Sequence, residues 1–128
     1  MAEPLYRSMN EARDGKPEVG RSARTLGVRP GIDILVGPDC TVVGRAGGMS
    51  VAPESRVNLP RHRLPPEDGG TGKDPVWEIG TADLGADLTY REDPLQPGVH
   101  GFVEPSRTMT LEDYDRALAA TREAWRLL

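Results

Sequence analysis

The stretch IDILVGPDCTVVGRAGGMSVA, residues 32–52, carries the clearest β-strand signal in the chain. Its first five residues alternate between the two faces of a strand, residues 37–39 read Gly-Pro-Asp and signal a turn, and residues 41–43 supply a second, β-branched run. This order predicts a β-hairpin in which the two runs pair across the turn.

A pair of glycines follows the second run and stands just before a short polar residue. Gly47 and Gly48 lack a Cβ atom and permit positive φ angles, and Ser50 comes two positions after them. Such a backbone suits either a bulged turn between strands, which is the simpler interpretation, or the close approach of a ligand to backbone N–H groups. Ser50 therefore becomes a candidate for a functional site.

Composition indicates one domain over residues 1–128 with a single hydrophobic core. The chain has 37% hydrophobic residues, 15 Gly and 12 Pro, which favours a loop-rich fold and excludes a large helical bundle. Cys40 is the single cysteine, so no internal disulfide can form. We expect Cys40 to be a small buried hydrophobe in a reducing compartment.

Charge and hydropathy limit where the protein can reside and which partners it can bind. The N-terminus lacks the basic and apolar regions of a signal peptide, and no stretch approaches the ~18 apolar residues of a membrane span. We therefore expect a cytoplasmic protein without membrane contact. The net charge of −4 argues against bulk attraction to nucleic acid. Local phosphate contacts are conceivable for Arg21, Arg24 and Arg29 and for the run Arg61-His62-Arg63, although a solvated surface is the simpler interpretation.

Outside the first hairpin, the sequence predicts short strands and one long loop. Residues 53–75 are rich in Pro and Gly and predict an irregular segment, either a mobile flap or a loop that binds a partner. Short strands are expected at residues 5–9, 76–79, 88–91 and 99–105.

A C-terminal helix is the most regular element of the sequence. Thr110 is a suitable N-cap, and Glu112 and Asp113 complement the dipole of the first turn. One stripe then recurs at steps of three and four, and it consists of Leu111, Tyr114, Leu118, Thr121, Trp125 and Leu128. The pattern predicts one amphipathic helix, and together with the strands it predicts an α+β fold.

Arg7 is unusual because it shares one strand face with Leu5 and Met9, whereas Tyr6 faces the other side. A charged side chain between two apolar ones either lies at a sheet edge and extends outward, or points into a cleft and holds an anion or a carbonyl group. The second alternative makes Arg7 a candidate ligand-binding residue.

An imidazole and a carboxylate flank an aromatic ring on the last expected strand, because His100, Phe102 and Glu104 share one face. A hydrolase built from Ser50, His100 and Glu104 is conceivable, but Ser50 lacks the Gly-x-Ser-x-Gly context. A histidine satisfied within the strand is the structural alternative for His100. One Cys and two His leave too few ligands at useful spacing for a metal site.

The order of several short motifs along the chain is the remaining signal. These motifs are Leu5-Tyr6-Arg7, Gly31-Ile32-Asp33-Ile34 with Thr41-Val42-Val43, Gly47-Gly48-Met49-Ser50, Trp77-Glu78-Ile79, His100 with Phe102, Pro105 and Met109, and the helix through Trp125. In this order they span nearly the whole chain, and the chain resembles the small ADP-ribosyltransferase-like toxins typified by the type VI secretion exported effector two.

The resemblance implies an ADP-ribosyltransferase-like fold of split β-sheets with a C-terminal α-helix, and NAD in the cleft between the sheets. It implies Tyr6, Arg7, Gly48 and Ser50 as cofactor-binding residues, with Arg7 on a phosphate or the nicotinamide ribose and Ser50 supporting that ribose. It also implies Ser50 and His100 as catalytic residues, the imidazole donating a hydrogen bond or acting as a general base on the acceptor. The role of Glu104 stays open.

Two functions of different classes follow from this resemblance. The first is a bacterial toxin, a mono-ADP-ribosyltransferase or an NAD glycohydrolase, that acts on an unidentified macromolecular acceptor in the cytoplasm of its own or of another cell. Its partner would be a cognate immunity protein or antitoxin, and type VI secretion would deliver it without a signal peptide. The second is a non-catalytic protein-binding module of the same fold that contacts its partner through residues 53–75.

Overall fold

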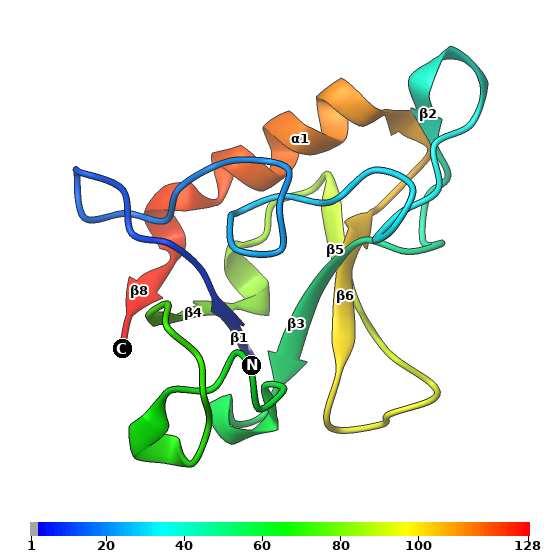
Figure 1. The fold of residues 1–128 in the computed structure, drawn as a ribbon. Helices are drawn as coiled ribbons and strands as arrows, with labels where there is room; N and C mark the ends of the chain where they lie inside the picture. Colours follow the sequence, from blue (N-terminus) through cyan, green and yellow to red (C-terminus); the bar gives the residue numbers. More distant parts are fainter. Residues whose placement is uncertain (1–2) are drawn as a thin grey trace.

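One six-stranded antiparallel sheet organises the protein, which is described over residues 3–128 by a computed structural model (Figure 1). In the order of pairing, its strands are β5 (Leu88–Glu92), β6 (Gly101–Pro105), β3 (Met49–Pro53), β1 (Pro4–Ser8), β4 (Val76–Gly80) and β8 (Arg126–Leu127). A two-stranded ladder of β2 (Thr41–Val42) with β7 (Met109–Thr110) and the helix α1 (Leu111–Ala120) accompany this sheet. The predicted α+β class is confirmed.

The large sheet divides between its two central strands, β1 and β3. Their register consists of Leu5 opposite Pro53 and Tyr6 opposite Ala52. Beyond these two pairs, β1 continues against β4 and β3 continues against β6. Figure 1 shows β1 and β3 close together near the start of β1 and apart at their other ends. The sheet therefore opens into the halves β5-β6-β3 and β1-β4-β8, and this split positions the site described below.

The main hydrophobic core joins α1 to the sheet. Its largest fully buried side chains include Trp77 of β4, Tyr114 of α1 and Trp125, which follows the helix. In Figure 1, α1 crosses above the end at which the halves diverge. A smaller cluster lies under residues 53–75 and consists of Ala52, Leu59, Leu64 and Val76.

The C-terminal helix begins as predicted but ends earlier. The Thr110 hydroxyl accepts a hydrogen bond from the Asp113 N–H at 3.1 Å, as an N-cap does. The helix stops at Ala120, because the Thr121 hydroxyl donates to the Leu118 carbonyl and the chain tightens into a 3-10 turn. Trp125 still reaches the core from this turn, and its indole N–H donates to the Thr121 hydroxyl. Over residues 3–128, no helix combines the length and the apolarity that crossing a bilayer requires.

The hairpin predicted within residues 32–43 does not form. Residues 32 and 33 lie in a turn, Ile34 forms an isolated bridge with Pro30, and residues 35 and 36 are irregular. The strand β2 pairs with β7 instead. The Asp33 carboxylate accepts hydrogen bonds from the backbone N–H and the guanidinium of Arg29, which gives the chain a local alternative to a strand ladder. Of the alternating residues, Ile34 is buried and Val36 packs against the core, while Ile32 is 71% exposed.

The prediction that Cys40 is buried is wrong. Cys40 is exposed and ends the 3-10 turn Pro38–Cys40, in which Asp39 and Cys40 have φ angles of 59° and 54°. Pro38 fixes the entry to this turn, and an Asp at the next position tolerates the left-handed conformation, so the sequence turns at the surface. The thiol consequently faces solvent.

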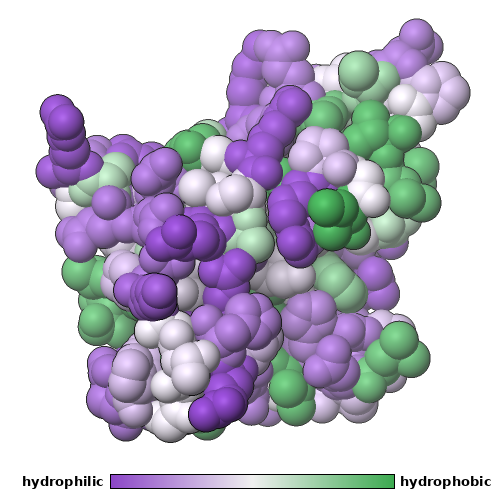
Figure 2. Space-filling view, in the orientation of Figure 1, coloured by the Kyte–Doolittle hydropathy of each residue, from purple (hydrophilic) through white to green (hydrophobic). Residues whose placement is uncertain are grey.

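Exposed apolar side chains gather near this turn. Figure 2 shows a mostly hydrophilic surface with apolar groups at the upper right, over the region of β2 in Figure 1. The loop that leads to β2 and the residue after it contribute exposed Ile32, Leu35 and Val43. These side chains add little to the core.

Residues 53–75 are irregular after the end of β3, as predicted, with 3-10 turns at Arg56–Asn58 and Pro66–Asp68. They are nevertheless tied together, because the Thr71 N–H donates to the Arg61 carbonyl and the Gly72 N–H donates to the Leu64 carbonyl. Gly70 packs directly against the backbone of Leu64, because an added Cβ atom would lie 2.0 Å from the Leu64 carbonyl oxygen. The mobility of this segment stays a prediction.

Candidate functional site

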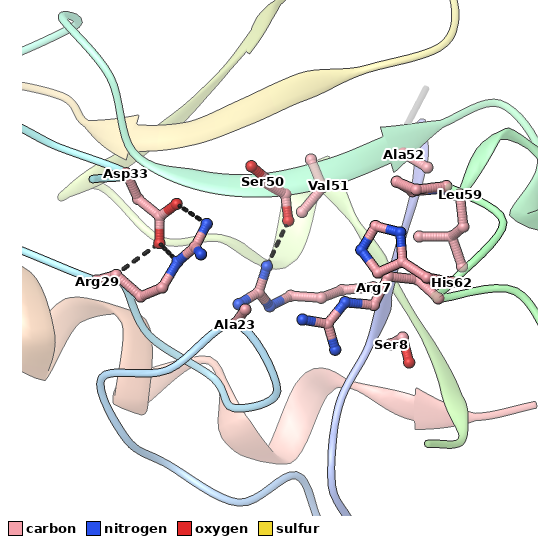
Figure 3. A pocket seen from close by; sticks show the side chains of 12 residues that line it. Arg7, Ser8, Ala23, Arg29, Asp33, Ser50, Val51, Ala52, Leu59 and His62 are labelled. Carbon is pink, nitrogen blue, oxygen red and sulfur yellow. Dashed lines mark hydrogen bonds and ion pairs between the residues drawn. The ribbon is translucent and has the colours of Figure 1, made fainter. Parts of the chain in front are cut away.

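A pocket of about 260 Å³ lies where β1 and β3 separate (Figure 3). Its floor comes from the two central strands, and its walls come from residues 23–33 and residues 59–63. The lining residues are Arg7, Ser8, Ala23, Arg29, Asp33, Ser50, Val51, Ala52, Leu59, Pro60, His62 and Arg63. The split between the sheet halves therefore creates a cavity in which polar groups from four segments meet.

Arg7 connects three of these segments and points into the cleft rather than outward. Its Nε and Nη2 groups donate to the Thr25 carbonyl at 3.2 and 2.9 Å, and Nη2 also donates to the Gly27 carbonyl. Nη1 donates to the Ser50 carbonyl at 2.7 Å (Figure 3). Arg7 therefore does not extend outward from a sheet edge. It points into a cleft and holds carbonyl groups there.

The Arg7 guanidinium is a buried charge whose hydrogen bonds all go to neutral carbonyl groups. Its residue is 6% exposed, and within residues 3–128 no carboxylate forms an ion pair with it. The pKa of Arg7 is lowered to about 10, mainly because burial disfavours the charged form. The nearby negative charge of Asp33 opposes this shift, and the positive charge of Arg63 adds to it. A buried cation without a counter-charge is costly, so this position favours an anionic ligand.

Ser50 contributes both its backbone and its hydroxyl to the site. Its carbonyl receives the Arg7 hydrogen bond, while its half-buried side chain makes no hydrogen bond to another described residue. Because Ser50 lies opposite Phe102 in the β3–β6 ladder, its side chain shares a sheet face with the Phe102 ring. The hydroxyl is free to contact a ligand.

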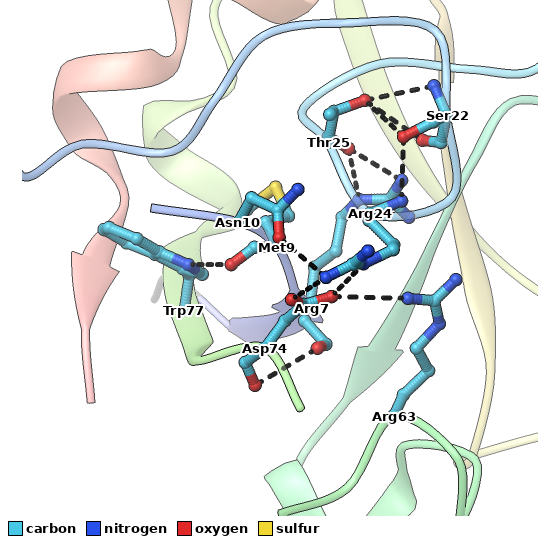
Figure 4. A network of polar contacts seen from close by, with 10 residues as sticks. Arg7, Met9, Asn10, Ser22, Arg24, Thr25, Arg63, Asp74 and Trp77 are labelled. Atoms are coloured by element: carbon cyan, nitrogen blue, oxygen red, sulfur yellow. Dashed lines mark hydrogen bonds and ion pairs between the residues drawn. The ribbon is translucent and has the colours of Figure 1, made fainter. Parts of the chain in front are cut away.

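Two ion-pair networks support the walls. Arg29 and Asp33 form a pair at 2.9 Å within one wall. Behind the pocket, Arg24 binds both oxygens of Asp74 at 2.7 Å, and Arg63 lies 3.8 Å from the same carboxylate (Figure 4). The hydrogen bonds from Arg24 hold the pKa of Asp74 below its usual value. Asp74 thus links the wall that contains Arg24 to the wall that contains Arg63.

Comparison with known protein families gives a match over nearly the whole chain. The family model described as Tse2 ADP-ribosyltransferase toxin matches residues 3–125. The chain belongs to the Tse2 ADP-ribosyltransferase toxin family. The resemblance seen in the short motifs and the predicted ADP-ribosyltransferase-like fold are both confirmed by this match. A search among curated proteins finds no match.

In this member of the Tse2 family, His100 lies outside the pocket lining but close to Ser50 in the register. The strand β6 begins one residue after His100. The His100 and Phe102 rings pack edge to face, with their centroids 4.9 Å apart. The β3–β6 ladder pairs Phe102 with Ser50 and ends at Gly101, so His100 lies just beyond the end of this ladder. Nδ1 of His100 lies 2.9 Å from Oδ2 of Asp93, and this hydrogen bond is the main reason that the pKa of Asp93 is lowered. The catalytic role of His100 stays a prediction.

Tyr6 and Gly48 do not line the pocket, so their assignment as cofactor-binding residues also stays a prediction. Tyr6 packs beside the small cluster under residues 53–75, and burial is the main cause that raises its pKa. Gly48 has a structural explanation: an added Cβ atom would lie 2.3 Å from the Val103 carbonyl oxygen and 2.6 Å from the Tyr114 hydroxyl. The Tyr114 hydroxyl also accepts a hydrogen bond from the Met49 N–H and donates to the Val103 carbonyl.

Glu104 is fully buried and its carboxylate is occupied within the fold. Arg91 donates to both of its oxygens at 3.0 Å, and the Gly47 N–H donates to one of them at 2.8 Å. The carboxylate therefore fixes the glycine turn that leads into β3. This geometry assigns Glu104 a positioning contact and leaves it no oxygen directed into the pocket.

Several pocket residues were missed or undervalued by sequence reasoning. Arg29 is a possible phosphate contact from the sequence, but its pairing with Asp33 is not expected because Asp33 is predicted to lie in a strand. An Arg four residues before an Asp is the signal that could have indicated this pair. For residues 61–63, the sequence favours a solvated surface over a phosphate contact. His62 and Arg63 line the pocket, whereas Arg61 does not. In the described part of the chain, no group of three or more His, Cys, Asp or Glu could hold a metal ion.

Proposed function

We propose that this protein binds NAD in the pocket between the sheet halves and transfers its ADP-ribose moiety to a macromolecular acceptor, or to water. The buried charge of Arg7 is the observation that carries the proposal. The diphosphate of NAD is an anion, and an anion near Arg7 offsets the cost of burying the guanidinium. Membership in an ADP-ribosyltransferase toxin family supports NAD over other diphosphates.

In the proposed complex, each site residue has one task. Arg7 has one N–H of Nη1 left after its bonds to carbonyl groups, and it donates this group to a phosphate or to the nicotinamide ribose. Ser50 donates or accepts through its unbonded hydroxyl and orients that ribose. Asp33 is already paired with Arg29, so it shapes the wall rather than adding a free negative charge.

His100 serves the acceptor in this proposal. Transfer breaks the bond between the anomeric carbon of the ribose and the nicotinamide nitrogen, and nicotinamide leaves with the bonding electrons. The acceptor oxygen or nitrogen forms the new bond to the anomeric carbon and gives up a proton. Asp93 holds Nδ1 of His100, which leaves Nε2 to receive that proton as a general base.

We further propose that the protein acts in the cytoplasm of a target cell, reached through type VI secretion, and that a cognate immunity protein neutralises it. The family description as a toxin supports this biological role. Growth arrest on intracellular expression, relieved by co-expression of the neighbouring gene, is the expected outcome. Unimpaired growth at a measured high level of soluble protein contradicts it.

The enzymatic proposal is tested by incubating the purified protein with NAD and measuring nicotinamide release and ADP-ribosylated products by mass spectrometry. Ser50→Ala and His100→Ala are expected to lower turnover at least about tenfold while the melting temperature stays near that of the parent. His62→Ala changes another lining residue of the same pocket and separates general damage from a specific loss. Turnover unchanged in both Ser50→Ala and His100→Ala overturns the assignment of these residues.

A non-catalytic binding module is the second candidate function. The exposed Ile32, Leu35 and Val43 favour it, because large apolar side chains outside the core are typical of contact surfaces. Calorimetry with NAD separates the two functions. If the protein does not bind NAD but forms a complex with a protein partner, and Leu35→Asp disrupts that complex, the result supports the binding module. The same result contradicts the proposed enzyme.

A further inference from the structure

Positive charge around the pocket is only partly neutralised. Arg29 is paired with Asp33, so these two charges cancel. Asp74 is the shared carboxylate of Arg24 and Arg63, and Arg24 takes both of its oxygens at 2.7 Å. Arg7 has no carboxylate partner within residues 3–128. Two positive charges therefore remain near one small cavity.

Arg63 is the second incompletely paired cation. Its side chain is 20% exposed, and its shortest contact with Asp74 is 3.8 Å, which exceeds a hydrogen bond. Its guanidinium makes no hydrogen bond to another residue in the described chain, so its donors are available. Figure 4 shows the Arg63 guanidinium extending from its loop toward the Asp74 carboxylate and the side of the molecule that holds Arg7.

The segment that carries Arg63 is held in place. The Leu64 N–H donates to the Pro60 carbonyl at 3.0 Å, and Leu64 is buried beside Leu59. Gly72 packs directly against the backbone of Arg63, because an added Cβ atom would lie 2.6 Å from the Arg63 carbonyl carbon. A guanidinium on a fixed backbone is a better ligand for a phosphate than one on a free loop, because less conformational entropy is lost on binding.

We infer that Arg63 is a second cationic contact for the ligand and that, together with Arg7, it forms a diphosphate-binding site across the pocket. The ligand class is a molecule with a pyrophosphate bridge, such as a nucleoside diphosphate or its sugar ester. This inference rests on the proposed function and deepens it, because it assigns the diphosphate half of the ligand to the 59–63 wall. It leaves the nicotinamide half to Ser50.

Isothermal titration calorimetry of the full chain tests this inference with two probes, inorganic pyrophosphate and ADP-ribose. Arg63→Ala is expected to weaken binding of both at least about tenfold, as the loss of a charge-assisted contact does. Arg63→Lys keeps the positive charge but lacks the planar guanidinium. Its affinity is expected to lie between those of the parent and of Arg63→Ala. Arg61→Ala is the matched control, since Arg61 is exposed on the same segment and does not line the pocket. Its affinity is expected to stay within about twofold of the parent.

The outcomes separate the inference from the proposed function. Equal losses in Arg63→Ala and Arg61→Ala indicate general surface charge and overturn the inference. If Arg63→Ala binds pyrophosphate as tightly as the parent while the parent turns over NAD, the inference about Arg63 is overturned. The proposed enzymatic function is then unaffected. Pyrophosphate binding that depends on Arg63, in a protein that neither binds nor cleaves NAD, supports the inference and removes the proposed function.

Discussion

Arg7 and Ser50 are 43 positions apart in the sequence, yet the Arg7 Nη1 group donates a 2.7 Å hydrogen bond to the Ser50 carbonyl. The bond crosses the split at the point where β1 and β3 have stopped pairing. A side chain here takes the place of the backbone ladder. Arg7 is therefore a cross-link of the fold as well as a candidate ligand contact.

Replacing Arg7 by Met is expected to destabilise the protein by about 3 kcal/mol, because the carbonyls of Thr25, Gly27 and Ser50 lose their donors. Relief of the buried charge offsets part of this loss. Urea unfolding measures the change, with Arg13→Met at an exposed position as the control, expected within about 0.5 kcal/mol of the parent. An Arg7→Met midpoint equal to that of the parent contradicts the cross-link.

Gly48→Ala is expected to destabilise the protein by about 2 kcal/mol or more, because the new Cβ atom would lie 2.3 Å from the Val103 carbonyl oxygen. Gly37→Ala is the matched control, since its Cβ atom would meet nothing closer than 3.6 Å. Thermal unfolding compares the two variants. Equal melting temperatures would show that the sheet adjusts at Gly48, and that its glycine then needs a ligand-based explanation.

Asp74→Asn is expected to remove a pH-dependent contribution to stability of about 1 kcal/mol at neutral pH, since its partner Arg24 is largely exposed. Arg24 lowers the pKa of Asp74 in the folded state. The contribution is therefore present above the ordinary carboxyl pKa near ~3.9 and is lost as the pH falls through the lower, folded value. Unfolding free energies of parent and variant should converge as the solution is acidified. A difference that stays constant down to the lowest accessible pH contradicts the ion pair.

Asp93→Asn is expected to change the protonation pattern of the His100 ring. Asp93 accepts from Nδ1 in the parent, so neutral His100 should carry its proton there, whereas an Asn offers either an acceptor or a donor. Nitrogen-15 NMR of the imidazole reports the tautomer directly. Turnover should fall about tenfold along with the tautomer change, and a tautomer unchanged in the variant rules out Asp93 as the positioning residue.

The parts of the fold that local signals specify were predicted from the sequence. Thr110 caps α1 as expected, and Leu111, Tyr114 and Leu118 form its buried stripe. The order of motifs from Arg7 to His100 was enough to predict the family and the split sheets. These features depend on neighbours in the chain or on patterns that a whole family shares.

Tertiary contacts account for what the sequence did not reveal. The alternation in residues 32–36 imitates a strand, but Arg29 satisfies Asp33 within a turn and β2 finds its partner in β7. Arg63 looks like any surface arginine until the fold brings it beside the same cavity as Arg7. No sequence pattern predicts the role of Asp74, because its main partner, Arg24, lies 50 positions away along the chain.

The position of β1 in the middle of the sheet also determines when the pocket can assemble. During synthesis, β1 leaves the ribosome well before either of its neighbours, β3 and β4. A central strand cannot be enclosed until both neighbours have been made, and pairing over such sequence distances is slow. Arg7 can therefore reach the Ser50 carbonyl only after β3 has been made, and the pocket lacks one of its sides until then. The pocket between the sheet halves consequently closes only after most of the chain has been synthesised.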